Sequence, residues 1–205
     1  MKAFSDSITC TLYGHNPLRS TLKLKDLDQA NYETMKKLYA DRFNAGGDFD
    51  FFFTGAFNVD SLRAFTEQYI APLKAVKKRE SYTDRHIDFA KGTIDNNFLR
   101  QMETPQAILV QVWTGEHDYS MKDAAIVNAL GEILTQRYLK SIREDAGIAY
   151  SVGASGDLSY GLRDQYILQI QCPVKPAKLD SALLLMKQGI DDIAAKGVTA
   201  EELDK

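Results

Sequence analysis

Cysteine, proline and glycine are scarce in this sequence, and their scarcity excludes several classes of protein. The 205 residues include two cysteines, Cys10 and Cys172, and neither stands in a C-x-x-C pair. A disulfide-stapled scaffold and a cysteine-based zinc knuckle are therefore excluded, and both cysteines are expected to be buried free thiols. The 5 prolines and 13 glycines are too few for a fibrous or disordered chain. The composition instead predicts a soluble globular protein.

Long apolar runs and an excess of positive charge are also missing. No stretch approaches the roughly 20 apolar residues that span a bilayer, and the first ten residues are too polar for the core of a signal peptide. Lysine and arginine total 25 against 28 aspartate and glutamate residues, and neither sign forms a long block. Without a broad basic field, nucleic acid is not an expected partner.

The motifs of common catalytic sites are missing as well. His15, His86 and His117 stand far apart, and none belongs to an H-x-x-H, H-E-x-x-H or H-x-x-E-H pattern. No G-x-S-x-G elbow, phosphate-binding loop or dinucleotide fingerprint is present. Glu116, His117 and Asp118 form one tight cluster suited to acid and base chemistry, although a polar loop before a helix is the simpler interpretation.

Apolar residues at steps of three and four predict several amphipathic helices. These helices are expected over 31–44, from Asp60 or Ser61 to Pro72, from Ser120 to just before Gly147, and from about Leu179 to near Gly197. Thr199 and Glu202 then form a T-x-x-E capping box, which predicts one more helix. Because the chain stops soon after Glu202, we interpret Lys205 as an artificial boundary or a processing cut.

Alternating side chains predict the strands. Phe49, Phe51 and Phe53 share one face of an extended run and Phe52 lies on the other, which predicts a central strand covered on both sides. Further strands are expected over His86–Gly92 within 82–94, over Ala107–Trp113, and over Ala149–Ser155 and Gln165–Cys172, the last two joined as a hairpin across 156–164.

Arg143 and Tyr150 flank the turn that follows the long helix. Because the chain reverses between them, their side chains can meet at one concave spot. A guanidinium and a phenol both donate hydrogen bonds, which suits a peptide carbonyl or a developing oxyanion. Spacing alone favours a structural role instead, with Arg143 paired to a carboxylate and Tyr150 covering the core.

The run Arg143–Ser151 (REDAGIAYS), after a long helix, resembles the C-terminal domain of the pitrilysin and insulinase zinc metallopeptidases, the inverzincin family. The segment 32–58, with FDFFFTGAFN, is similar to that family's helix, strand and G-x-F-N-type turn, and METPQAILVQVWTG at 102–115 to the strand region that follows. The resemblance covers roughly residues 20 to 200. It implies an α+β fold, an antiparallel sheet with helices packed on one face.

The same resemblance implies the organisation and the role of the chain. Residues 1–205 would form a single peptidase-family C-terminal domain, with 1–25 a lead-in segment and 199–205 the start of a truncated helix. The domain would clasp substrate in a zinc-dependent endopeptidase and be inactive alone. Zinc would bind the H-x-x-E-H catalytic half, in the same polypeptide or in a partner subunit. Arg143 would bind a substrate carbonyl and Tyr150 would donate to the oxyanion; no catalytic residue or metal ligand is expected in this chain.

Two other hypotheses remain open. A structural or assembly subunit is possible because the family includes peptidase-derived proteins that kept the fold and lost catalysis. An independent enzyme using the acid and imidazole cluster at 116–118 is the third. The resemblance leaves the compartment open, although related bacterial enzymes suggest the periplasm or cell envelope for the parent protein.

Overall fold

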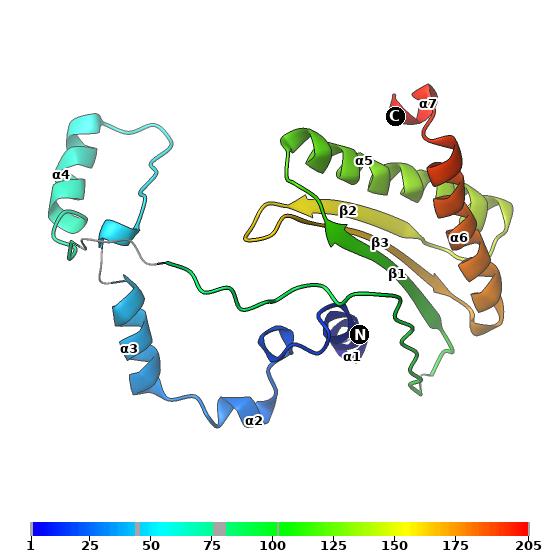
Figure 1. Cartoon of the computed structure of the whole chain (residues 1–205), viewed down its shortest axis with the longest axis horizontal. Coiled ribbons are helices and arrows are strands. Elements are labelled where there is room, and N and C mark those ends of the chain that lie inside the picture. Colours follow the sequence, from blue (N-terminus) through cyan, green and yellow to red (C-terminus); the bar gives the residue numbers. More distant parts are fainter. Residues whose placement is uncertain (1, 44–45, 76–80, 102, 205) are drawn as a thin grey trace. The chain divides into compact units, whose positions relative to one another are not determined.

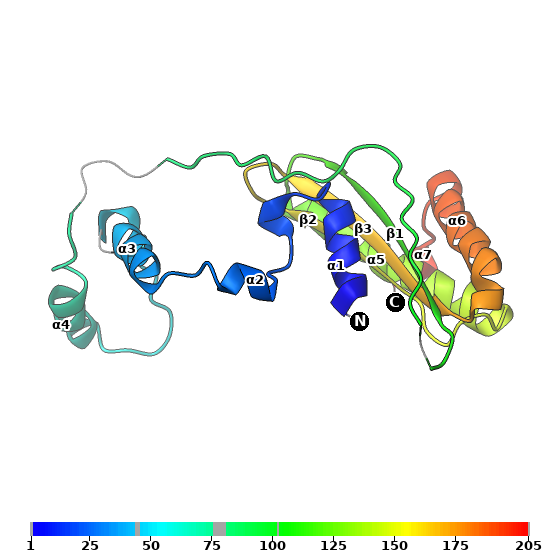
Figure 2. The same ribbon diagram turned by 90° about the horizontal axis from the view of Figure 1, so that it is seen from below.

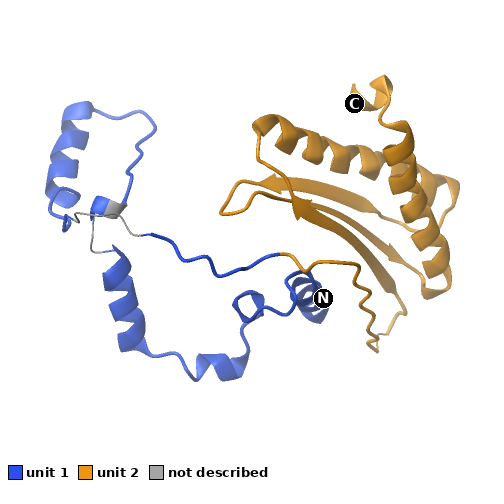
Figure 3. Ribbon diagram, viewed as in Figure 1, with its two compact units in different colours: residues 1–88 blue, residues 89–205 orange. Residues whose placement is uncertain are grey.

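The computed structural model describes residues 2–43, 46–75, 81–101 and 103–204 of the chain. The chain divides into two compact units, residues 1–88 (unit 1) and 89–205 (unit 2), as Figure 3 shows. The single domain over 1–205 stays a prediction, and among the described residues only unit 2 has buried side chains. Within the described ranges no helix is both long and apolar enough to cross a bilayer.

Unit 1 consists of short helices joined by irregular segments. Its elements are α1 (Lys2–Leu12), the 3-10 helix η1 (Pro17–Arg19), α2 (Leu24–Leu27), α3 (Tyr32–Phe43), the 3-10 helix η2 (Gly46–Asp48) and α4 (Val59–Tyr69) (Figure 1). α3 confirms the helix predicted over 31–44, whose last residue lies outside the described ranges. α4 confirms the next helix, but its cap is Asn58, whose side chain accepts a hydrogen bond from the Ser61 amide at 2.9 Å.

The phenylalanine-rich segment of unit 1 is not the central strand that the sequence predicts. Residues 50–54 are irregular, and Phe52 is 87% exposed. The strand predicted within 82–94 is also irregular. A strand needs a neighbour for its N–H and C=O groups, and the sheet formed by the described residues has strands from unit 2 only. Both strand predictions were wrong, because alternating side chains are compatible with a strand but do not ensure that a neighbouring strand is present to pair with it.

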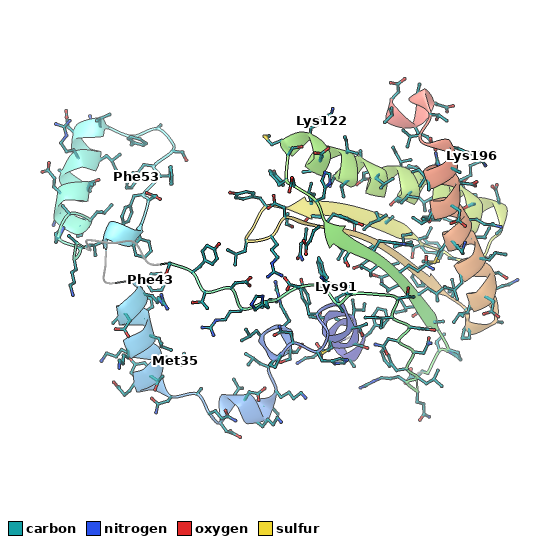
Figure 4. The ribbon with its side chains drawn as sticks, viewed as in Figure 1. Met35, Phe43, Phe53, Lys91, Lys122 and Lys196 are labelled. Carbon is teal, nitrogen blue, oxygen red and sulfur yellow. The ribbon has the colours of Figure 1, made fainter. Side chains whose placement is uncertain are left out.

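The aromatic rings of unit 1 contact one another in a row. The ring centroids of Tyr39 and Phe43 are 4.7 Å apart, those of Phe43 and Phe49 are 5.8 Å apart, and those of Phe49 and Phe51 are 6.1 Å apart. Phe43 and Phe53, labelled in Figure 4, remain 50% and 46% exposed. Unit 1 therefore gathers aromatic side chains without covering them.

Unit 2 is a three-stranded antiparallel sheet with helices on one face (Figures 1 and 2). The strands are β1 (Ala107–Glu116), β2 (Gly153–Ser159) and β3 (Gln165–Val174), in the order β1-β3-β2. The helical elements are α5 (Met121–Tyr138), the π-helix η3 (Leu139–Asp145), the 3-10 helix η4 (Pro176–Lys178), α6 (Leu179–Lys196) and α7 (Ala200–Leu203). This arrangement confirms the α+β class and the antiparallel sheet.

Most predicted boundaries of unit 2 hold. β1 and β3 confirm the strands predicted from Ala107 and from Gln165, and each is longer than predicted. The hairpin is confirmed, but β2 begins at Gly153 rather than Ala149. Ala149 and Val152 are buried before β2 starts, so these residues are apolar because they pack in the core and not because they pair with β3.

The helix ends of unit 2 follow their sequence signals. The Ser120 side chain accepts from the Asp123 amide at 2.9 Å and starts α5. Thr199 and Glu202 form the predicted capping box of α7. The residues that begin α5 and α7 can therefore be identified from the sequence itself. Lys205, the predicted boundary residue, lies outside the described ranges.

The core lies between the sheet and the helices α5, η3 and α6. Alternate residues of β3 are buried on the helix side, and the buried core residues are Leu134, Tyr138, Ile142, Ala149, Val152, Leu168, Ile170, Cys172, Val174, Ala182 and Met186. The Tyr138 hydroxyl donates to the carbonyl of Met186 at 2.7 Å. Burial raises the pKa of both Tyr138 and Cys172 above their ordinary values. Cys172 is the buried free thiol that the sequence predicts, whereas Cys10 is half-buried.

α5 packs directly on the backbone of β2. A Cβ atom added to Gly131 would lie 2.6 Å from the Gly156 amide nitrogen, and one added to Gly156 would overlap the carbonyl oxygen of Val127. The Thr135 hydroxyl accepts from the Ala154 amide at 2.8 Å and shares its own proton between the carbonyl oxygens of Ala154 and Gly131, each 3.0 Å away. The helix therefore covers the outer edge of β2 at this point.

Candidate functional site

The candidate site begins where α5 passes into the π-helix η3 (Leu139–Asp145). Ile142 in η3 is fully buried in the core, while the next residue, Arg143, is exposed. Core packing thus fixes the backbone beside a guanidinium that faces solvent. π-helical turns are uncommon and recur at functional sites.

The chain leaves η3 through a tight reversal at Gly147. Gly147 has a φ of 59°, in the left-handed region that glycine adopts without strain. The amide of Ile148 donates to the carbonyl of Ile142 at 2.9 Å and closes the turn. Ala149 is then buried, which anchors the exit and leaves Tyr150 on the surface.

The reversal brings the two predicted site residues together. The Cζ atom of Arg143 lies 5.3 Å from the centroid of the Tyr150 ring, within cation–π range. Tyr150 is 86% exposed, so it does not cover the core. Within the described residues no carboxylate forms an ion pair with Arg143. Among the described residues, the two contacts that a structural role predicted, a carboxylate beside Arg143 and the core beneath Tyr150, are therefore not formed.

This pair offers hydrogen-bond donors on an open surface. A guanidinium presents five N–H donors in a plane and keeps its charge, and a phenol adds one O–H donor. Such a set can bind a carbonyl or a developing oxyanion.

Two hollows lie near Tyr150, and Arg143 lines neither of them. The first hollow has a volume of about 660 Å³ and is lined by residues 103–106, 148–150 and 173–175. The second, of about 460 Å³, runs along residues 151–155 with Gln169, Gln171 and Pro173. Pro173 borders both hollows, so they adjoin near Tyr150.

Of the acid and imidazole cluster at 116–118, His117 contacts the helix cap that Ser120 and Asp123 form. His117 Nε2 lies 3.4 Å from Asp123 Oδ2, on the first turn of α5. A hydrogen bond from the Ser120 hydroxyl, followed by one from His117, lowers the pKa of Asp123. The side chains of His117 and Asp123 are 54% and 40% exposed. This geometry stabilises the start of α5.

No metal centre is formed by the described part of the chain. His15 and His86 both have left-handed backbone, and His86 lies 3.4 Å from Asp84. Among the residues placed in the structure, no group of three or more histidine, cysteine, aspartate and glutamate side chains could hold a metal ion.

Sequence reasoning missed two features of unit 2. Arg137 Nε donates to Glu202 Oε1 at 2.6 Å, and its Nη2 reaches Glu202 Oε2 and the Gly197 carbonyl at 2.9 Å each. This contact joins residues far apart in sequence, and no local pattern signals it. The second feature is the pair Gln169 and Gln171 in β3, which the alternation Q-I-Q could have indicated.

Comparisons with known proteins identify the family. The profile described as the peptidase M16 inactive domain matches residues 29–205, and no curated protein sequence matches the chain. Three solved structures superpose on 99% of it: the periplasmic protease PqqL from Escherichia coli (TM-score 0.78, 20% identity), the ferredoxin protease FusC in complex with Arabidopsis ferredoxin (0.76, 14%), and a peptidase M16 inactive domain from Pseudomonas fluorescens (0.67, 20%).

The superpositions show the fold alone, because the identities are low. The chain spans 22% of PqqL and of FusC, and 48% of the Pseudomonas structure. The profile match covers most of the chain and includes the run around Arg143 and Tyr150. It confirms the resemblance to the zinc-less C-terminal domain of the pitrilysin and insulinase peptidases. The chain belongs to the peptidase M16 inactive-domain family.

Proposed function

We propose that this chain clasps peptide substrate for an M16 zinc endopeptidase and is inactive alone. The observation that carries the proposal is the exposed pair of Arg143 and Tyr150. The Arg143 Cζ atom lies 5.3 Å from the centroid of the Tyr150 ring, and Tyr150 lines a hollow of about 660 Å³. A rigid helix end and a glycine turn position both side chains. Donors fixed in this way lose little freedom when a ligand binds, which favours binding.

The two side chains divide the work. The planar Arg143 guanidinium binds a carbonyl oxygen of the substrate backbone, and contact with the Tyr150 ring limits its motion. The Tyr150 hydroxyl donates to the oxygen that gains negative charge during peptide-bond cleavage. These interactions hold and orient the substrate but supply no nucleophile.

The reaction itself belongs to a partner half. A zinc ion on an H-x-x-E-H helix of that half would supply activated water. FusC is a protease crystallised with ferredoxin and PqqL is a protease, which supports a peptide or protein substrate. The periplasm or cell envelope is the proposed compartment of the parent protein.

Arginine and tyrosine variants of the assembled peptidase test this proposal. We expect Arg143→Ala to lower peptide turnover by at least about tenfold, and Tyr150→Phe by about 10² to 10³, since each removes a donor at the reacting carbonyl. Zinc content measured by mass spectrometry should stay unchanged. The exposed Arg63 in α4 provides the control Arg63→Ala, which should leave turnover intact. Unchanged kinetics in Arg143→Ala would overturn the assigned role.

The second candidate is an assembly subunit that has lost catalysis. The exposed aromatic row of unit 1, around Phe43 and Phe51, favours it because such surfaces recur at protein interfaces. Purification of the native protein together with its partners distinguishes the assembly subunit from the substrate-clasping domain. A stable complex that lacks H-x-x-E-H in every chain would support assembly, and a partner with that motif would support the clasp.

A further inference from the structure

We propose that the face of the unit 2 sheet opposite α5 and α6 binds the extended main chain of a peptide substrate beyond the Arg143 and Tyr150 pair. The contact surface is the glutamine trough, lined by Ser151, Gly153, Ser155, Gln169, Gln171 and Pro173. This inference rests on the proposed function, because it extends the same peptide past the same site. It adds a binding surface and two specific amide contacts.

The strand register forms the trough. Leu168, Ile170 and Cys172 of β3 are buried on the helix side, so Gln169 and Gln171 between them lie on the opposite face. Gln169 pairs with Ser155 of β2 and Gln171 pairs with Gly153. Each amide therefore stands beside a small residue, and this leaves a hollow of about 460 Å³.

Gly153 shows that the hollow is open. A Cβ atom added there would meet no heavy atom within 4 Å, whereas one added to Gly156 in the same strand would overlap the backbone of α5. The space above Gly153 is thus free within the described structure. A ligand backbone can approach the strand closely at this point.

The chemistry of the trough suits a peptide main chain. Each glutamine amide has both an acceptor oxygen and two donor hydrogens, which matches the alternating C=O and N–H groups of an extended peptide. No charged residue lines this hollow, so neither an anion nor a metal ion is the expected ligand. The five residues 151–155, of which the last three belong to β2, span about 15 Å, which corresponds to roughly five residues of extended peptide.

Because the trough adjoins Tyr150, we expect it to bind the same peptide as the Arg143 and Tyr150 pair. Ser151, at its end, directly follows Tyr150, and Pro173 also borders the hollow beside Tyr150. A peptide held at Tyr150 therefore continues into the trough without a break.

Addition of the peptide to the edge of β2 is disfavoured. The Ala154 amide already donates to the Thr135 hydroxyl at 2.8 Å, and this hydroxyl lies 3.0 Å from the carbonyl oxygens of both Ala154 and Gly131, which share its single proton. A strand docking there would have to displace these bonds. Binding across the face through the glutamine side chains requires no such displacement.

Peptide binding to the 205-residue chain tests the proposal. Fluorescein-labelled unstructured peptides of about six and about twenty residues are titrated and followed by anisotropy; the longer one spans more than the roughly five residues that the trough accommodates. Gly153→Leu places a side chain in the trough at a position where a Cβ atom meets no heavy atom within 4 Å, and Gln169→Ala combined with Gln171→Ala removes the amides. The matched control is Gln188→Leu on the exposed surface of α6. Trp113 fluorescence checks that each variant is folded.

We expect both trough variants to weaken binding of the long peptide by about tenfold, as loss of two hydrogen bonds implies. The short peptide should change by less than about twofold, and Arg143→Ala should weaken both peptides. Unchanged affinity of the long peptide in both trough variants would overturn the trough while leaving the Arg143 role intact. Trough sensitivity without any effect of Arg143→Ala would instead overturn the proposed function.

A second copy of the chain is the alternative occupant of this face. Light scattering of the wild type and of Gly153→Leu distinguishes it. A wild-type dimer that Gly153→Leu converts to a monomer would assign the trough to self-association and overturn peptide binding. A monomer in both cases is the expected result.

Discussion

Unit 1 and unit 2 both contain helices with apolar residues at helical spacing, but among the described residues only unit 2 has a core. Every buried hydrophobic residue in the described part of the chain lies between Ile133 and Met186. In α4 of unit 1, Phe65 and Tyr69 follow the same helical spacing but are 58% and 66% exposed. An apolar stripe therefore stabilises a helix only when a sheet stands opposite it.

The sheet accounts for the difference. In unit 2 the helix-facing residues of β3 give α5 and α6 a common surface to cover. Unit 1 has a row of aromatic rings from Tyr39 to Phe51 in place of that surface. Burial of apolar area is roughly additive, so its absence in unit 1 predicts a difference in response to mutation.

The largest expected effect comes from truncating a core side chain. Leu134→Ala in α5 removes a fully buried side chain and should lower the free energy of unfolding by about 2 to 5 kcal/mol. Phe65→Ala in α4 should change it by less than about 1 kcal/mol, because Phe65 is exposed. Urea unfolding followed by circular dichroism measures both. Equal losses would show that unit 1 is covered and would break the comparison.

A smaller effect is expected at the contact between helix and strand. Gly156→Ala places a methyl group against the Val127 carbonyl and should cost about 1 to 3 kcal/mol. Gly153→Ala, three residues earlier in the same strand, enters open space and should stay within about 0.5 kcal/mol. The fluorescence of Trp113, the single tryptophan, reports unfolding of unit 2 alone. A tolerated Gly156→Ala would mean that α5 can move away from β2.

The smallest effect concerns the pH dependence of the α7 contact. Hydrogen bonding from Arg137 lowers the pKa of Glu202 from 4.5 to about 2. A carboxylate with a lowered pKa stabilises the fold above its ordinary pKa, and this stabilisation is lost as pH falls from 4.5 to about 2. The wild type and Glu202→Gln should therefore differ in urea midpoint at neutral pH and converge through that window.

The control for the α7 contact is Glu132→Gln, at an exposed position of α5. The difference in urea midpoint between Glu132→Gln and the wild type should not disappear as the pH falls from 4.5 to about 2. A Glu202→Gln difference that stays constant with pH would assign the contact to packing rather than to charge.

Local sequence signals predicted unit 2 well. Ser120 and Gly147 mark the start of α5 and the turn after η3 because caps and left-handed turns depend on single residues. β1 and β3 follow from alternation because one face of each is buried. The start of β2 was predicted too early because Ala149 and Val152 are buried in the core, and their apolar pattern resembles that of a strand.

Non-local contacts explain what the sequence could not predict. The run around Phe51 has the alternation of a strand, but pairing depends on residues elsewhere. The family resemblance selected Arg143 and Tyr150, yet their approach depends on a π-helix and a buried Ile142, which no spacing rule supplies. The trough needs the register of β2 against β3.

The hydroxyl of Thr135 takes up a backbone donor at the outer edge of β2. Because the Ala154 amide donates to this hydroxyl at 2.8 Å, that N–H is not available for pairing with a further strand. One small side chain of a helix thus protects a point on the sheet edge where a neighbouring polypeptide could otherwise add a strand.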